Sequence, residues 1–392
     1  MKFDEAFFDQ IIDRRNTNCE KWDDRNVMDA DAIPLWVADM DFTCPPAISE
    51  AIRERAEHPC FGYNLDDPAE EEALIGYWQR RHGIAFRAED IQMLPCVVTG
   101  LKVCVRALTA PGDSVAIVTP VYGPFYGSIQ SNGRKVHPVS LLRREDTGRY
   151  ELDFQAMEEA LKNGAKLMML CSPHNPVSRL WSEEELTRLC RLARKYDVPV
   201  VCDEIHADFV YKPGRFVSIL AIPGGRERAV MLCSASKTFN VAGLQQAAMV
   251  CENSEMMEKL RRDMNASGAV SGNTFARIAA RTAYTACDDW LDGLTDYLDG
   301  NRRLLANWVA EYLPKVKMSP IEATYLAWLD LRAYGLTCEE MARKFRAAKV
   351  ALSGGTFFGE EGEGFMRVNF ACPRSQLAEG IKRGKAALED EE

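Results

Sequence analysis

The sequence lacks the features that would place it in a membrane or on a nucleic acid. None of its apolar runs is long enough to span a bilayer. Its first fifteen residues carry Asp4, Glu5, Asp9 and Asp13, so they lack the basic and then apolar layout of a signal peptide. Lys and Arg number 48 against 58 Asp and Glu, a formal net charge of −10. Because no apolar run spans a bilayer, we do not expect a membrane as the main partner. Because nucleic acids are bound by clustered basic residues, we do not expect a nucleic acid either.

The thirteen cysteines include no Cys-x-x-Cys pair. Several lie inside apolar runs, among them Cys171, Cys202, Cys233 and Cys251. The sequence therefore predicts reduced, buried thiols in a cytoplasmic protein, and we assign no metal site. A nucleophilic cysteine is the less favoured alternative.

The length of 392 residues suits a large globular domain and a smaller one. Short apolar runs alternate with amphipathic stretches in the middle of the chain, which is typical of βαβ units and a mainly parallel sheet. The clearest unit is a strand at 166–170, a helix at 182–196 and a strand at 198–201. Ser182 and Glu185 predict a capping box at the start of that helix. Further strands are expected at 114–118, 229–232 and 247–250.

The pattern becomes helical from about residue 276 to 313, and a strand at 324–329 and a helix at 338–348 follow. We expect an α/β fold with two domains. The large domain, residues 45–285, would hold the mainly parallel sheet between helices. The smaller α+β domain would combine residues 286–392 with the N-terminal residues 1–44.

Polar or aromatic residues follow four of the expected strands. The four segments are Thr119-Pro-Val-Tyr122, Ser172-Pro-His-Asn-Pro176, Asp203-Glu-Ile-His206 and Ser234-Ala-Ser-Lys237. Ligands of open parallel sheets bind beyond the carboxyl ends of the strands, where these groups would meet. Pyridoxal 5′-phosphate (PLP) needs such a set. Its aldehyde needs an amine, its pyridine nitrogen a carboxylate, its ring oxygen a donor, and its phosphate hydroxyls and N–H groups.

Each of these signals has an ordinary structural alternative when it is taken alone. Lys237 could be a surface lysine, Asp203 a helix N-cap, Asn175 part of a turn and Tyr122 a packing residue. Their order, each after a separate strand, favours the cofactor site. In addition, a carboxylate directly after the apolar run 198–202 is poorly solvated unless it faces a cation.

These motifs occur in the order and spacing of the aminotransferase-like PLP enzymes of fold type I, which the chain resembles over nearly its whole length. More narrowly, it resembles the cystathionine β-lyase or C-S lyase branch, the MalY/PatB type. The segments that carry this likeness are 37–42 (VADMDF), 61–63 (FGY), 172–176 (SPHNP), 203–206 (DEIH), 324–330 (TYLAWLD), 364–369 (GFMRVN) and 372–374 (CPR).

The resemblance implies that Lys237 holds PLP as a Schiff base and that Asp203 pairs with its pyridine nitrogen. Asn175 and His206 would lie near the ring oxygen, and Tyr122 would stack on the ring.

By the same resemblance, Ser234 and Ser236 would meet the phosphate, together with the backbone N–H groups of Val97 and Val98 at a helix start. Tyr63 would reach the phosphate of the neighbouring subunit and act in its site, which implies a homodimer with shared active sites.

On the substrate side, the resemblance assigns Arg367 to the carboxylate as a bidentate fork, and Asp39 and Asn369 to the substrate as well.

Three positions depart from the family pattern. Cys96 stands where relatives often have glycine, and Ser178 stands where a glycine often closes the Asn-Pro motif. Gln245 stands where typical aminotransferases have a phosphate-binding arginine.

The resemblance implies α,β-elimination on a cysteine-type amino acid such as cystathionine, which gives a thiol (homocysteine), pyruvate and ammonia. Transamination would use the same residues and differs only in where the proton returns, so it stays an alternative. A lyase with an added regulatory, protein-binding role is the other.

Overall fold

The computed structural model of the protein describes residues 2–29, 31–65, 67–269 and 272–389. Within these ranges, seven strands form the central sheet. In spatial order they are β2 (Ile91–Leu94), β10 (Ala247–Val250), β9 (Ala229–Cys233), β8 (Val200–Asp203), β7 (Leu167–Cys171), β3 (Ser114–Thr119) and β4 (Lys135–Ser140). All neighbours from β9 to β4 are parallel, whereas β10 is antiparallel to both β2 and β9. The prediction of a mainly parallel sheet is confirmed.

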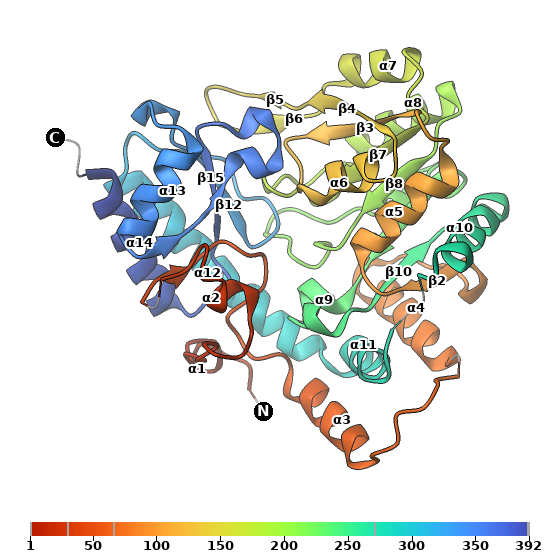
Figure 1. Ribbon diagram of the computed structural model, residues 1–392, viewed down its shortest axis with the longest axis horizontal. Helices are drawn as coiled ribbons and strands as arrows, with labels where there is room; N and C mark the ends of the chain where they lie inside the picture. The colour runs from red at the N-terminus through yellow and green to blue at the C-terminus, as the bar shows by residue number, and fades with distance from the viewer. Residues whose placement is uncertain (1, 30, 66, 270–271, 390–392) are drawn as a thin grey trace.

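The inner strands of the central sheet are buried on both faces, and their residues alternate between two apolar clusters. In β3, Ala116 and Val118 belong to one cluster, and Val115 and Ile117 belong to the other. The helices that contribute to the second cluster are α5 (Val97–Leu108), α6 (Pro124–Gln130) and α10 (Ser254–Ser267). Those of the opposite face include α7 (Phe154–Lys162) and α8 (Glu183–Tyr196) (Figure 1). Burial on both sides explains why these strands read as continuous apolar runs.

The start of α8 has the predicted capping box. The hydroxyl of Ser182 accepts a hydrogen bond from the N–H of Glu185 at 3.1 Å, and the carboxylate of Glu185 accepts one from the N–H of Ser182 at 2.8 Å. Two of the N–H groups that a helix start leaves unpaired are thereby satisfied. Leu186 and Leu189 on the inner side of the helix are fully buried.

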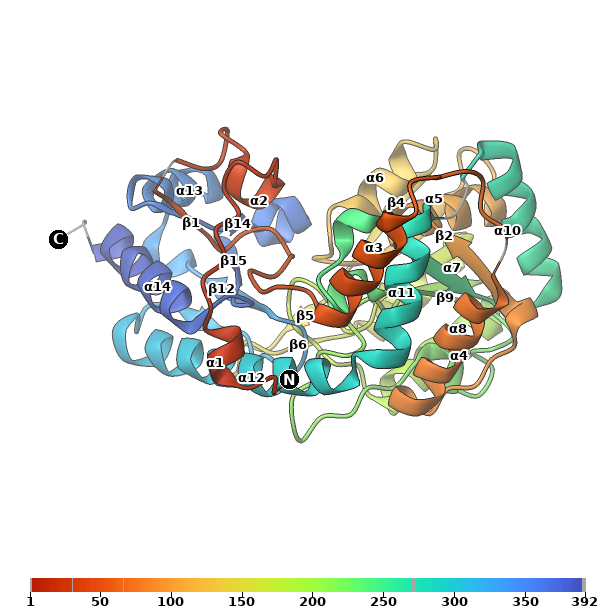
Figure 2. The ribbon, with the colours of Figure 1, turned by 90° about the horizontal axis from the view of Figure 1, so that it is seen from below.

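A second lobe contains an antiparallel sheet. Its strands in spatial order are β11 (Lys317–Met318), β12 (Leu326–Asp330), β15 (Phe365–Asn369) and β14 (Ser353–Gly354). The helices of this lobe are α13 (Cys338–Ala347), α14 (Arg374–Glu389) and most of α12 (Asp288–Tyr312), which extends from one lobe to the other (Figure 2). The large lobe also holds α3 (Pro46–Glu57), α4 (Pro68–His82), α9 (Ala235–Thr238) and α11 (Thr274–Ala286) (Figure 1).

The N-terminal segment packs on the second lobe. Its strand β1 (Ile33–Pro34) pairs in parallel with β13 (Val350–Ala351). Its helix α1 (Glu5–Phe8) lies along α12, where the ring of Phe8 is 5.7 Å from that of Trp290 (Figure 2). A short helix, α2 (Glu20–Asp23), comes between α1 and β1 in the sequence.

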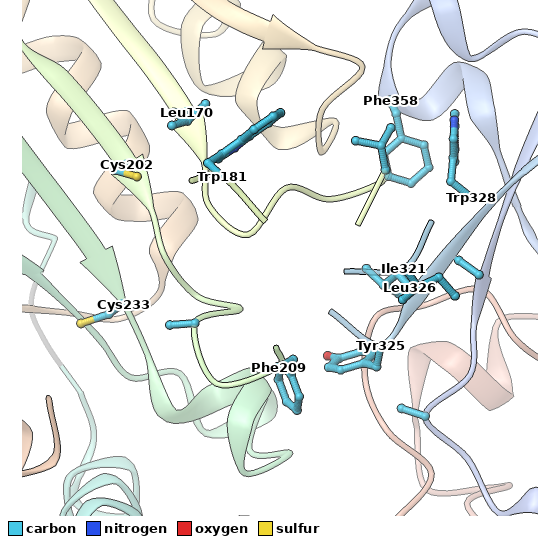
Figure 3. Close-up of a cluster of buried hydrophobic side chains, with 14 of the residues drawn as sticks. Leu170, Trp181, Cys202, Phe209, Cys233, Ile321, Tyr325, Leu326, Trp328 and Phe358 are labelled. Atoms are coloured by element: carbon cyan, nitrogen blue, oxygen red, sulfur yellow. The ribbon is translucent and has the colours of Figure 1, made fainter. Parts of the chain in front are cut away.

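The two lobes are joined by backbone and aromatic contacts next to the end of β8. The N–H of Thr324 donates to the carbonyl of Phe209 at 2.7 Å, and the ring of Phe209 lies 4.8 Å from that of Tyr325 (Figure 3). These contacts place β12 and its neighbours opposite the carboxyl ends of the large-lobe strands.

The thirteen cysteines are all free, and Cys171, Cys202, Cys233 and Cys251 are buried, as the sequence predicts. Burial raises the pKa of Cys202 well above its ordinary value, which keeps that thiol protonated and unreactive. Across the ranges that the structure describes, no helix combines the length and the apolar character needed to cross a membrane.

Replacing Ser182 with alanine should lower the free energy of unfolding by about 1 kcal/mol, because the N–H of Glu185 loses its acceptor. Ser182→Asp keeps an acceptor at the cap and serves as the matched control, with stability close to that of the wild type. The measurement is the urea midpoint of the three proteins. Equal midpoints for the alanine and aspartate variants would contradict the role of the cap.

Candidate active site

A cavity of about 1010 Å³ lies between the two lobes at the carboxyl ends of the strands. Its wall contains most of the residues that the sequence singles out: Asp39, Val97, Val98, Tyr122, Asn175, Asp203, His206, Ser236, Lys237 and Arg367. Three others, Tyr63, Ser234 and Asn369, lie outside the wall. The strand ends therefore bring the amine, the carboxylate, the amide and the aromatic ring to one place.

Lys237 belongs to α9, a single helical turn that follows β9. Its amine donates to the carbonyl of Ala38 at 2.7 Å, and the same oxygen accepts from the hydroxyl of Tyr325 at 2.9 Å. Burial lowers the pKa of Lys237, although the charge of Asp39 opposes this effect. A lowered pKa favours the unprotonated amine, which is the form that reacts with aldehydes and accepts protons.

Asp203 is the last residue of β8 and is buried. Its Oδ1 accepts a hydrogen bond from the N–H of Ile205 at 3.1 Å. Burial raises the pKa of Asp203 to about 7, against the opposing effects of the Ile205 N–H and the Lys237 charge. The alternative that Asp203 caps a helix is wrong, since no helix of the described chain begins there. A carboxylate in such surroundings is stabilised by a ligand that carries a cation.

Arg367 reaches the cavity from β15 of the second lobe. Its Nη1 donates to Oδ1 of Asn175 at 3.0 Å, and its Nη2 donates to the carbonyl of Trp36 at 2.7 Å. Burial lowers the pKa of Arg367 to about 10, so the guanidinium stays charged at neutral pH. Because its oxygen faces Arg367, Asn175 can offer only its NH₂ group to a ligand oxygen.

His206 is buried, and burial lowers its pKa to about 3, with the charges of Lys237 and Arg367 acting in the same direction. The imidazole is therefore neutral, and its Nδ1 has no hydrogen-bond partner within the described residues. A buried polar atom of this kind indicates a place where a ligand supplies the missing partner.

Tyr122 lines the cavity, with its ring 6.1 Å from that of Phe357 in an edge-on contact. Burial raises the pKa of Tyr122, so its hydroxyl is neutral. The ring is thus held against one side of the cavity by another aromatic side chain, an arrangement suited to contact with a planar ligand.

Val97 and Val98 line the cavity where they open α5, as the sequence predicts. The side chain of the N-cap residue, Cys96, accepts no bond from a backbone N–H of this helix start, and its Sγ lies instead 3.3 Å from the hydroxyl of Thr99. The first-turn N–H groups are thereby left to water or to an anionic ligand.

Ser236 also lines the cavity, whereas Ser234 does not. The hydroxyl of Ser234 donates to the carbonyl of Gln246 at 2.5 Å and accepts from the N–H of Ser236 at 3.0 Å. Ser234 thus fixes the turn that presents Ser236 and Lys237. Gln245, which replaces the arginine of typical aminotransferases, has a positive φ of 61° and also lines the cavity.

Asn369 is buried behind the cavity wall. Its Nδ2 donates to the carbonyls of Val37 and Asp39 at 2.6 Å each, and its Oδ1 accepts from the N–H of Ala371 at 2.8 Å. These bonds use both of its donor hydrogens. The structure therefore places Asn369 as the support of the segment at 37–39 and not in the substrate's path.

Asp39 lies in the wall and pairs with Arg14, whose Nη1 and Nη2 lie 3.0 and 2.8 Å from the two carboxylate oxygens. Although burial acts to raise the pKa of Asp39, Arg14 and the charge of Lys21 hold it below its usual value. Asp39 therefore brings a negative charge to the cavity near Lys237.

Tyr63 is fully exposed and lies away from the cavity of its own chain. Phe61 and Leu65 in the same segment are also exposed.

Two residues that shape this site, Tyr325 and Arg14, were not identified from the sequence. Tyr325 stands within the motif at 324–330 but carried no role, and its contact with Ala38 depends on how the lobes meet. Arg14 lies in a segment without any recognisable motif. Ser178, which replaces a glycine, adopts a positive φ of 58° and bonds its hydroxyl to that of Thr324 at 3.0 Å.

The residues of the cavity fit PLP. Within the part of the chain that the structure describes, Asp203 has no ion pair and Nδ1 of His206 has no hydrogen-bond partner. Lys237 and the first residues of α5 line the same cavity. The ring nitrogen, ring oxygen, aldehyde and phosphate of PLP each find a matching group in this set.

Comparison with known proteins gives a consistent result. Residues 30–383 match the family model of aminotransferase class I and II. The chain is 40% identical to cystathionine beta-lyase PatB of Bacillus subtilis (strain 168), over 97% of this chain and 99% of that protein. Its structure is similar to PLP-containing cystalysin of Treponema denticola (TM-score 0.94, 30% identity, 98% and 99% of the two chains).

A third relative is the PLP-bound C-S lyase of Staphylococcus hominis (TM-score 0.89, 32% identity, 97% and 98% of the two chains). Together with the cavity, these similarities show that the chain belongs to the aminotransferase class I and II family, as a fold type I PLP-dependent enzyme of the C-S lyase branch.

Proposed function

We propose that the protein is a PLP-dependent C-S β-lyase that acts on cystathionine-type amino acids. With cystathionine, one water molecule is consumed and homocysteine, pyruvate and ammonia are formed. The observation that carries the proposal is a single cavity lined by Lys237 and Asp203 of one lobe and Arg367 of the other. The names of the relatives, cystathionine beta-lyase and C-S lyase, favour elimination over transamination.

The residues of the chain have separate tasks in this reaction. Arg367, charged and buried, binds the substrate carboxylate and so fixes the orientation of Cα. Lys237, with its lowered pKa, takes the proton from Cα and can return one to the leaving sulfur. When bound, PLP supplies the ring that accepts the electron pair left at Cα. Asp203 provides the negative charge that a protonated pyridine nitrogen requires, and Asn175 donates from its NH₂ group.

We also propose a homodimer in which Tyr63 acts in the site of the partner subunit. The support is the exposure of Phe61, Tyr63 and Leu65 together in one segment, because exposed aromatic and aliphatic side chains of this kind are commonly covered in an assembly. The two lobes would act as a large domain at 45–285 and a small one of 1–44 with 286–392. The reduced, buried thiols fit a cytoplasmic enzyme.

The first test is pyruvate release from cystathionine without any keto acid. Pyruvate and a free thiol should appear in equal amounts, and Lys237→Ala should lose at least about a hundredfold in rate, because it removes the proton-transferring amine. Lys166→Ala, at an exposed lysine, is the matched control and should keep full activity. Turnover that requires an added keto acid would identify an aminotransferase instead.

PLP affinity should depend on pH through Asp203. Burial raises the pKa of this carboxyl to about 7 from an ordinary 3.8. Below pH 7, Asp203 must therefore lose its proton before it can pair with a cationic ring nitrogen. The ratio of wild-type to Asp203→Asn affinity for PLP should rise about tenfold per pH unit below 7 and level off above it.

The affinity ratio is measured by titrating the two PLP-free proteins with PLP between about pH 5.5 and 8.5. A ratio that is flat over this range would mean that Asp203 does not pair with the cofactor. For the PLP-free protein the same shift has a known sign: the stability due to a protonated Asp203 is complete below pH 3.8 and is lost as the pH rises through 7.

The shared site predicts complementation between subunits. Mixing Tyr63→Ala with Lys237→Ala chains should restore about a quarter of wild-type activity at full random exchange, because half of the dimers would be mixed and each would have one intact site. Mixing Lys237→Ala with Asp203→Asn is the matched control and should restore nothing, since both residues line the cavity of one chain. Equal results from the two mixtures would contradict sharing through Tyr63.

A further inference from the structure

A buried carboxylate, that of Asp208, lies behind the cavity and not in its wall. It accepts hydrogen bonds from the hydroxyl of Thr238 at 2.6 Å and from that of Tyr77 at 2.7 Å. Nε2 of His82 lies 3.1 Å from its Oδ1. None of these four residues touches the space assigned above to cofactor or substrate.

The contacts of Asp208 connect the segments that carry the cofactor residues. Asp208 follows Asp203 by five residues and His206 by two. Thr238 directly follows Lys237 in α9. Tyr77 therefore holds Asp208 to α4, whereas Thr238 holds it to the helix of the lysine.

The helix α9 is too short to fix Lys237 by its own hydrogen bonds, since it spans only Ala235–Thr238. Its first residues are held by the hydroxyl of Ser234, which bonds to the N–H of Ser236. Beyond it, the amide of Asn240 donates to carbonyls of the N-terminal segment. The side-chain contact at the last residue of the helix is the one between Thr238 and Asp208.

Asp208 is ionised at neutral pH despite its position. Burial acts to raise its pKa, but the imidazole of His82 at 3.1 Å, followed by the hydroxyls of Thr238 and Tyr77, holds the pKa below its usual value. Hydrogen bonds to an ionised acceptor are shorter and stronger than those between neutral groups. The hydrogen bond from Thr238 to Asp208, at 2.6 Å, is therefore a strong one.

We propose that Asp208 is a positioning residue, which through Thr238 fixes the backbone of Lys237 relative to Asp203 and His206. The inference rests on the proposed function, because it concerns the lysine assigned there to PLP. Asp208 itself takes no proton and touches neither cofactor nor substrate. Its effect is to keep the amine within reach of the reacting atom.

Two variants separate positioning from a merely structural role. Thr238→Val and Tyr77→Phe each remove one hydroxyl from the same carboxylate, at bond lengths of 2.6 and 2.7 Å and at buried positions. Their costs in stability should therefore be similar. Only Thr238 adjoins Lys237, so only Thr238→Val should disturb the lysine. Thr238→Ser keeps the hydroxyl and is the conservative rescue, and Thr238→Ala replaces the valine variant if valine prevents folding.

The readouts are kcat and KM for pyruvate release, the pH midpoint of the visible absorption of bound PLP, and the rate at which PLP-free protein regains that absorption. Thr238→Val should lower kcat about tenfold with KM nearly unchanged, because displacing a catalytic group by about 1 Å costs up to about a hundredfold. It should also shift the absorption midpoint and slow PLP uptake. Thr238→Ser should restore most of each value.

Tyr77→Phe should leave all of these readouts within about twofold of the wild type, although its thermal midpoint falls as that of Thr238→Val does. Equal changes in the two variants, or no change in either, would overturn the positioning role. A wild-type protein that takes up no PLP or releases no pyruvate would instead overturn the proposed function, and the two failures are thus distinguishable.

Discussion

Burial of β7, β8 and β9 on both faces is the constraint on which the rest of the structure depends. A charged side chain inside such a strand would have neither water nor a partner, at a cost of several kcal/mol. The first polar groups therefore come at the strand ends, with Asp203 closing β8 and Ser234 following β9. Since these strands run parallel, their ends meet at one edge, and the second lobe closes over that edge to form the cavity.

The sequence predicted the elements that this constraint governs. β7, β8 and β9 lie within two residues of the predicted 166–170, 198–201 and 229–232, because an apolar run between polar residues marks a buried strand clearly. The same logic identified the polar strand ends, which supply Tyr122, Asn175, Asp203, His206, Ser236 and Lys237 to the cavity wall. What an end residue contacts was less predictable, as Ser234 shows: its residue type suits a phosphate, but its hydroxyl bonds to the carbonyl of Gln246.

Other features could not be read from local pattern. β4 is an edge strand with half-exposed residues and Pro138, so its alternation is weak, and nothing in the composition of β10 sets its reversed direction. Asn369 has the residue type of a ligand-binding amide, yet the direction of its side chain follows from the packing of the second lobe. The role of Asp208 could not be predicted from the sequence, because its three partners come from distant parts of the chain.

The carbonyl oxygen of Ala38 accepts from two donors, the amine of Lys237 in one lobe and the hydroxyl of Tyr325 in the other. A ligand that engages the amine leaves this oxygen with the phenol alone. Ligand binding in the cavity and packing of the N-terminal segment are therefore thermodynamically coupled. The free energy by which a bound ligand weakens this packing equals the free energy by which the packing weakens ligand binding. The stability of the packed loop at 36–41 therefore depends on whether the amine of Lys237 is bound to a ligand.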